Sequence, residues 1–152
     1  MLGIFCLSGC ASQSPQPADP AKNAQANEVL FTALGLVGTP YRYGGSSPDS
    51  GFDCSGLIQY VYAHSADIRL PRTVSGMYRI DAPTVTEGEL QAGDLVIFAT
   101  ESRSLPSHAG IYVGEGRFVH APSTGGSVRM DFLSDSYWQR SYLDAKRPLA
   151  AR

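Results

Sequence analysis

The chain has 152 residues, enough for one domain with a substantial hydrophobic core. Its composition, 43% apolar and 17% charged, is ordinary for a globular protein. The net charge of −2 offers no basic surface for nucleic acid, so we expect no nucleic-acid partner. No apolar run approaches the ~20 residues that a membrane-spanning helix needs.

The N-terminus has the pattern of an export signal. A short apolar stretch from Met1 to Leu7 ends in Leu7-Ser8-Gly9-Cys10. This sequence resembles the bacterial lipobox, in which the cysteine is acylated on its sulfur and becomes the new N-terminus. No Lys or Arg precedes the stretch, which is also short for a signal peptide. A translation start placed too far downstream would explain both, and a frayed apolar end is the alternative.

Residues 11–27 contain no large apolar side chain and cannot contribute to a core. We therefore expect residues 1–9 to be a signal segment, residues 10–27 a lipidated flexible tether and residues 28–152 the folded domain. Stable anchoring takes more than one acyl chain, as lipidation of Cys10 would provide. The expected location is the periplasm, on a lipid anchor in the outer membrane.

The rest of the chain predicts helices first and strands afterwards. Helices are expected over residues 28–37, capped by Asn27, and over residues 54–64, capped by Asp53, with a glycine-rich loop over residues 41–53 between them. A short helix should follow Thr73. Strands are expected over residues 95–99, 109–113, 117–121, 127–130 and 142–148, with a short helix over residues 136–140. This order indicates an α+β fold in which N-terminal helices pack on an antiparallel sheet.

Cys54 is the residue most suggestive of chemistry. It opens the second expected helix, where unpaired backbone N–H groups stabilise a thiolate and can lower the pKa of a cysteine. If Cys6 is removed with the signal and Cys10 is acylated, Cys54 is the only free thiol. It then cannot form an internal disulfide. An inert buried cysteine is the alternative, which its polar neighbours Asp53 and Ser55 disfavour.

A thiol nucleophile needs a base and a group that orients the base. His64 ends the helix that Cys54 begins, ~15 Å away, too far to be that base. His108 and His120 flank an expected hairpin around residues 114–116. With a three-residue loop they are diagonal neighbours on one face. A two-residue loop would put them out of phase unless a bulge intervenes. We expect His108 to be the general base and acid, and His120 to hold it in the productive tautomer.

Two alternatives remain for these histidines. They could be core residues whose ring nitrogens are hydrogen-bonded and have no catalytic role, although their joint placement on one hairpin favours catalysis. They could also share a zinc ion with Cys54, but the short ligand spacings typical of zinc sites are absent.

The motifs carry a family resemblance. They are Thr39-Pro40-Tyr41-Arg42-Tyr43-Gly44-Gly45, Phe52-Asp53-Cys54-Ser55-Gly56, Leu70-Pro71-Arg72, Gly93-Asp94-Leu95, His108-Ala109-Gly110-Ile111-Tyr112 and Phe118-Val119-His120-Ala121. Together, in this order, they resemble the NlpC-type bacterial cell-wall cysteine endopeptidases over about residues 29–148. The resemblance implies a papain-like fold and a catalytic trio at Cys54, His108 and His120, with Tyr41 bordering the site.

The same resemblance implies hydrolysis of peptide bonds in peptidoglycan stem peptides or cross-links, without a cofactor or metal ion, by a monomer. Asp53, Ser55 and Arg72 are the expected contacts to charged ends of the stem peptide; for Arg72 a solvated surface charge is an equal alternative. Two other functions are a non-catalytic peptidoglycan-binding scaffold lipoprotein and a thiol acyltransferase of the lecithin–retinol type. In the acyltransferase the histidine precedes the cysteine, which is the reverse of the order here.

Overall fold

The computed structural model describes residues 19–123 and 126–151. The expected signal segment, Cys10 and the first part of the expected tether lie outside the described residues. Within those ranges, no helix combines the length and the apolar character needed to cross a membrane.

The first helix starts earlier than expected. α1 spans Pro20–Gly35, not residues 28–37, so residues 20–27 are helical and do not belong to a flexible tether. Asp19, rather than Asn27, is the N-cap, and its carboxylate accepts a hydrogen bond from the Ala21 amide at 3.0 Å. Proline at the first helical position and three alanines before Asn27 favour a helix strongly enough to offset the lack of apolar side chains.

The second helix was predicted correctly at its start. α2 spans Cys54–Ala66, and its N-cap Asp53 accepts a hydrogen bond from the Gly56 amide at 2.7 Å. The glycine-rich loop before it contains a small hairpin that the sequence did not predict, β1 (Ser46–Ser47) paired with β2 (Gly51–Phe52). A Cβ atom on Gly56 would lie only 2.0 Å from the Gly45 carbonyl oxygen, so this loop presses directly on the start of α2.

Five antiparallel strands form the main sheet, in the order β6-β5-β4-β3-β7. They are β3 (Leu95–Phe98), β4 (His108–Gly114), β5 (Arg117–His120), β6 (Arg129–Phe132) and β7 (Tyr142–Lys146). The short helices are α3 (Val74–Tyr78), capped by Thr73 as expected, and α4 (Ser136–Ser141). Single 3₁₀ turns occupy Glu87–Glu89 and Pro148–Ala150. The α+β architecture predicted from the sequence is confirmed.

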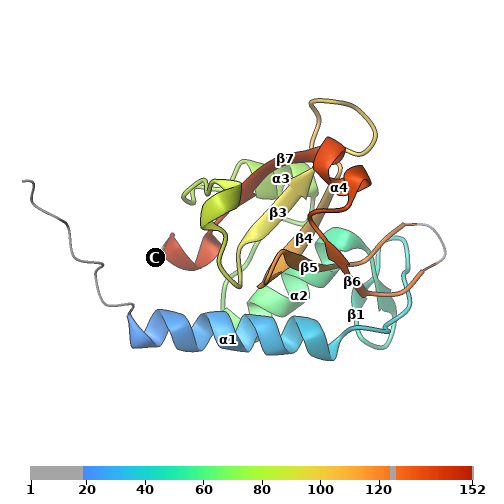
Figure 1. Ribbon diagram of the computed structural model, residues 1–152. Helices are drawn as coiled ribbons and strands as arrows, with labels where there is room; N and C mark the ends of the chain where they lie inside the picture. The colour runs from blue at the N-terminus through green and yellow to red at the C-terminus, as the bar shows by residue number, and fades with distance from the viewer. Residues whose placement is uncertain (1–18, 124–125, 152) are drawn as a thin grey trace, which may run out of the picture.

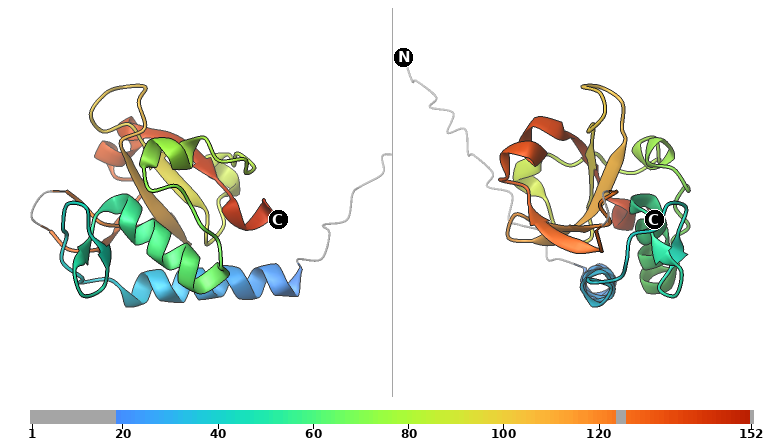
Figure 2. Two further views of the ribbon diagram at one scale, coloured as in Figure 1. Left: turned by 180° about the vertical axis from the view of Figure 1, so that it is seen from behind. Right: turned by 90° about the vertical axis from the view of Figure 1, so that its right-hand side faces the viewer.

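The sheet is covered on both faces. In Figures 1 and 2, α1 and α2 lie together on one side, and α4 lies away from them. Leu95, Ile97 and Ile111 point toward α1 and α2 and share a core with Val29, Leu57 and Val61. The alternate side chains form a second core on the other face, with Trp138 of α4 at its edge: Val96, Phe98, Phe118, Leu133 and Ala145.

The β4–β5 hairpin reaches the expected register by a different route. Its loop is the two-residue turn Glu115–Gly116, in which both residues have positive φ. That loop alone would place the histidines out of phase, but the pairing shifts between Tyr112 and Gly114. This bulge restores the pairs Tyr112–Phe118 and Ile111–Val119. His108 and His120 therefore lie on the same face.

The next strand differs from its predicted position. β6 spans Arg129–Phe132 instead of residues 127–130, and it pairs with β5 so that Arg129 faces His120 and Asp131 faces Phe118. Val128 does not belong to β6: its backbone amide bonds to the Thr39 carbonyl, in the loop that follows α1. The shift brings Asp131 into the sheet beside His120.

Candidate active site

Cys54 lines an open cleft. The cleft has a volume of about 1010 Å³, and both Cys54 and His108 line it. The cysteine is half-buried and unpaired in the described part of the chain. Tyr41, Asp53, Ser55 and Arg72, the substrate-binding residues predicted from the sequence, also line this cleft. The chain therefore gathers these residues around one solvent-accessible thiol.

Three of those residues form a network of their own. The Arg72 guanidinium donates to both carboxylate oxygens of Asp53, at 3.0 and 2.8 Å, and to the Ser55 hydroxyl at 2.6 Å. Burial alone would raise the pKa of Asp53, but the hydrogen bonds from Arg72 and from two backbone amides hold it below its ordinary value. Asp53 is thus an ionised helix cap already paired with a cation.

The Cys54 thiol has a raised pKa, contrary to the expectation from its helix position. Burial is the main cause, and the negative charge of Asp53 adds to it, while backbone N–H groups of Ala109, Ser55 and Cys54 itself partly oppose it. The sulfur therefore holds its proton at neutral pH as long as His108 is neutral. A nucleophilic role for this sulfur would require a base to take that proton.

The two hairpin histidines are in direct contact. His108 Nε2 lies 2.8 Å from His120 Nδ1, and the two rings are nearly perpendicular, at 86°. Gly110 makes room for this contact, because a Cβ atom there would lie 3.2 Å from the Cβ of His120 and 2.7 Å from the Phe118 ring. A side chain at residue 110 would force the rings apart.

Asp131 extends the chain of hydrogen bonds and was not predicted from the sequence. His120 Nε2 lies 2.7 Å from Asp131 Oδ2, and Arg129 Nε donates to the same oxygen at 3.0 Å. Burial by itself would raise the pKa of Asp131, but the bonds from His120 and Arg129 keep it below its ordinary value. An ionised carboxylate only accepts hydrogen bonds, so His120 Nε2 carries a proton.

The tautomer of His108 follows from that assignment. With its proton on Nε2, a neutral His120 offers Nδ1 as an acceptor, and His108 Nε2 must donate to it. The lone pair of His108 is then on Nδ1, the nitrogen outside this chain of bonds. Nucleophilic attack by a thiol needs a base with a free nitrogen, and His108 lines the same cleft as Cys54.

Both imidazoles are neutral at physiological pH. Burial, followed by the proximity of His120, lowers the pKa of His108 to about 3, and burial also lowers the pKa of His120 despite its bond to Asp131. Trp138 contributes to this burial. Its ring stacks on His108, at a centroid distance of 5.5 Å, and meets His120 edge-on at 4.9 Å.

Stability should therefore fall in mild acid. The unfolded chain protonates His108 near pH 6.5, whereas the folded chain resists down to about pH 3, so protons favour unfolding between these values. We expect the free energy of unfolding to drop by about 2–3 kcal/mol between pH 7 and pH 4.5. Urea unfolding at several pH values measures this slope, and the His108→Gln variant should flatten it. An unchanged slope in that variant would contradict neutral burial of His108.

The geometry disfavours the zinc alternative. Both ring nitrogens of His120 are engaged, one with His108 and one with Asp131, which leaves neither to ligate a metal beside Cys54. Among the described residues, no three His, Cys, Asp or Glu side chains are placed to hold a metal ion.

Comparison with known proteins identifies the family. The model of the NlpC/P60 family matches residues 38–147, most of the chain. The chain belongs to the NlpC/P60 family. A crystal structure of an NlpC/P60 family protein from Bacillus cereus superimposes with a TM-score of 0.75 at 32% identity, covering 82% of this chain and 40% of that one. The resemblance found in the motifs is thereby confirmed, and so is the α+β fold.

Two curated NlpC/P60 relatives from Escherichia coli (strain K12) are similar over nearly the whole chain. The murein DD-endopeptidase MepH is 43% identical over 148 residues, which are 96% of this chain and 55% of MepH. The probable endopeptidase NlpC is 34% identical over 154 residues, covering 97% of this chain and 96% of that protein. The chain spans about half of the length of MepH and less of several other curated relatives.

Proposed function

We propose that this protein is a cysteine peptidase that hydrolyses peptide bonds in the stem peptides or cross-links of peptidoglycan. The observation that carries the proposal is the chain of hydrogen bonds from Asp131 through His120 to His108, because His108 lines the same cleft as Cys54. Membership of the NlpC/P60 family and the similarity to murein and peptidoglycan endopeptidases support peptidoglycan as the substrate.

The reaction begins with transfer of the thiol proton. The raised pKa of Cys54 reflects the cost of ionising the thiol while His108 is neutral. The lowered pKa of His108 reflects the cost of protonating the imidazole while the thiol is neutral. Transfer of the proton from Cys54 to His108 charges both groups at once, and their attraction offsets part of each cost. Cys54 then attacks the substrate carbonyl while His108 becomes an imidazolium, which the ionised Asp131 stabilises through His120.

The negative oxygen of the tetrahedral intermediate needs hydrogen-bond donors. The Cys54 backbone N–H and the Tyr41 hydroxyl are the candidates in the cleft, and burial raises the pKa of Tyr41, which keeps its proton available. Ser55 fits this role less well, because its hydroxyl is already bonded to Arg72 and Asp53. His108 next protonates the leaving amine, and water, activated by His108, releases the acyl group from Cys54.

Arg72, Asp53 and Ser55 form one wall of the cleft beside the nucleophile. Since Asp53 is paired with Arg72, the wall presents a guanidinium and a hydroxyl in fixed positions rather than a free carboxylate. This wall suits charged or polar groups of the acyl half of a stem peptide.

Digestion of purified peptidoglycan, followed by mass analysis of the released peptides, tests the function. Release of fragments cut at a stem-peptide or cross-link amide supports the proposal, and the fragment masses identify the bond. Intact peptidoglycan after prolonged incubation with folded, reduced protein would contradict it.

Lipid anchoring through Cys10 in the outer membrane is a separate proposal, because residues 1–18 lie outside the described residues. It rests on the lipobox pattern at residues 7–10. We expect the Cys10→Ser variant, expressed in a bacterium with its full N-terminal segment, to move from the membrane pellet to the soluble periplasmic fraction. If the variant still sediments with membranes as the unchanged protein does, the anchor is not at Cys10.

A further inference from the structure

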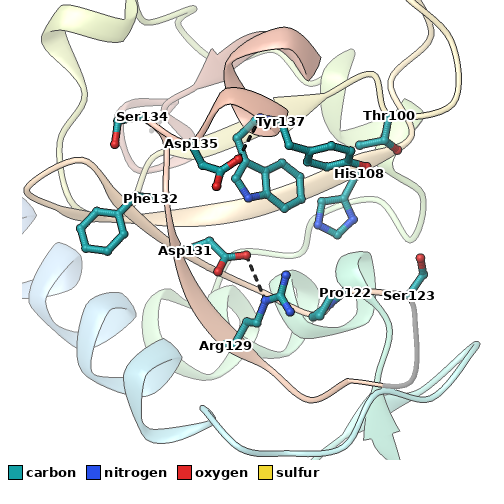
Figure 3. A pocket seen from close by; sticks show the side chains of 11 residues that line it. Thr100, His108, Pro122, Ser123, Arg129, Asp131, Phe132, Ser134, Asp135 and Tyr137 are labelled. Carbon is teal, nitrogen blue, oxygen red and sulfur yellow. Dashed lines mark hydrogen bonds and ion pairs between the residues drawn. The ribbon is translucent and has the colours of Figure 1, made fainter.

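A second groove continues from the cysteine cleft. Its volume is about 630 Å³, and it shares Thr100, His108 and Ser123 with the first. Figure 3 shows it from close by, with His108 on one side and Asp131 and Arg129 on the other. Cys54 lines only the first groove, so His108 marks the junction between the two.

This arrangement gives each groove one half of the substrate. Attack by Cys54 leaves the acyl half bonded to its sulfur, in the groove that contains the thiol. The leaving nitrogen must face His108 to receive its proton. A peptide that lies across both grooves would then place the half that departs, on the amine side, in the second groove beyond His108.

Arg129 is the cation of this second groove. Its side chain is 55% exposed, and only Nε is used, in the bond to Asp131. Within the described residues the two terminal nitrogens of its guanidinium have no partner. The two acidic residues of the groove are both committed, Asp131 to His120 and Arg129, and Asp135 to the Tyr137 amide at the start of α4. Among the described residues that line this groove, the charged group with unused hydrogen-bonding atoms is therefore the Arg129 guanidinium.

We propose that Arg129 binds a free carboxylate on the residue whose amide nitrogen leaves. A guanidinium with two unused N–H groups fits a carboxylate, and such charge-assisted bonds are stronger than bonds to a neutral amide. This inference rests on the proposed peptidase function. The substrate class is a stem-peptide link whose nitrogen belongs to a residue with a free carboxylate near that nitrogen, in preference to the same link carrying a carboxamide.

Two matched substrates distinguish carboxylate binding by Arg129 from a purely structural role of its side chain. Two synthetic cross-linked peptides should differ only in whether the carboxylate beside the scissile nitrogen is free or amidated. We expect the unchanged protein to favour the free carboxylate about tenfold in kcat/KM. The Arg129→Gln variant should bring that ratio close to one. Arg129→Lys should keep part of it, because the charge remains but the planar fork is lost.

The ratio of kcat/KM between the two substrates is informative because a substitution that only distorts the active site does not change it. Loss of the Arg129 contact to Asp131 would slow both substrates alike, whereas loss of carboxylate binding slows only one. Arg140, an exposed arginine on the neighbouring helix α4, provides the matched control, and Arg140→Gln should keep the ratio of the unchanged protein. A ratio within twofold of one in the unchanged protein, or an undiminished ratio in Arg129→Gln, would overturn the inference.

A binding measurement tests the carboxylate site at Arg129 separately from the proposed peptidase function. If the protein digests neither peptidoglycan nor either peptide, the peptidase function fails, but the uncleaved free-carboxylate peptide can still be titrated and followed by the NMR signal of the Trp138 indole N–H. Trp138 lines the second groove. A shift that saturates in the unchanged protein and is lost in Arg129→Gln supports the carboxylate site; equal shifts in both proteins, or none in either, refute it.

Discussion

Replacing Cys54 with alanine is expected to lower peptidoglycan hydrolysis by at least about 10³-fold, because Cys54 is the only thiol among the described residues that line the cleft. The substitution removes one half-buried sulfur at the first position of α2 and leaves the Asp53 cap intact, so the fold should persist. Release of soluble peptides, measured over several hours, gives the rate.

Two comparisons make this result specific. Cys54→Ser keeps a hydroxyl in the same place and should be almost equally inactive, because His108 would have to deprotonate a far weaker acid than a thiol. The melting temperatures of both variants report whether the domain is intact. If Cys54→Ala digests peptidoglycan as fast as the unchanged protein, the peptidase assignment fails. Wall turnover in cells that is unaffected by Cys54→Ser would favour the scaffold function instead.

Replacing His120 with alanine should lower kcat by about 10²–10³-fold while the thiol and the base remain. Without His120, the Nε2 proton of His108 loses its acceptor and the imidazolium loses its link to Asp131. His108 can then carry its proton on Nδ1, where it blocks uptake of the thiol proton.

His120 is fully buried, so its removal leaves a cavity that could destabilise the domain. Asp131→Asn gives a milder test. An asparagine keeps the size of the side chain but can donate to His120, which allows the opposite tautomers. We expect a loss of about 10–100-fold in kcat with a small change in melting temperature. Full activity in this variant would show that Asp131 does not set the tautomers.

Elements with a capping residue and a strong apolar pattern were predicted correctly. Asp53 and Thr73 cap α2 and α3 as expected, because the capping hydrogen bond lies within four residues of sequence. The start of α1 was wrong because the prediction required apolar side chains, whereas Asp19, Pro20 and several alanines sufficed. β6 was misplaced by two residues because the partner of Val128 is Thr39, 89 positions away in sequence.

That misplacement concealed Asp131. With β6 at residues 127–130, Asp131 falls just outside the sheet, so nothing suggested a partner for His120 beyond His108. The period-two reasoning applied to the β4–β5 hairpin, extended by one strand in the correct register, would have placed Asp131 diagonally from His120. Trp138 could not be found in this way, because its position depends on how α4 packs on the second face of the sheet.

The sequence by itself determined the reactive groups, namely the thiol at a helix start and two histidines on one hairpin, because caps and strand alternation act over a few residues. Only the tertiary structure decided how these groups behave. It placed Asp131 against His120, buried both imidazoles under Trp138, paired Asp53 with Arg72 and opened the groove beside Arg129. Protonation and specificity depend on burial and on charges brought from distant parts of the chain, which local sequence patterns do not encode.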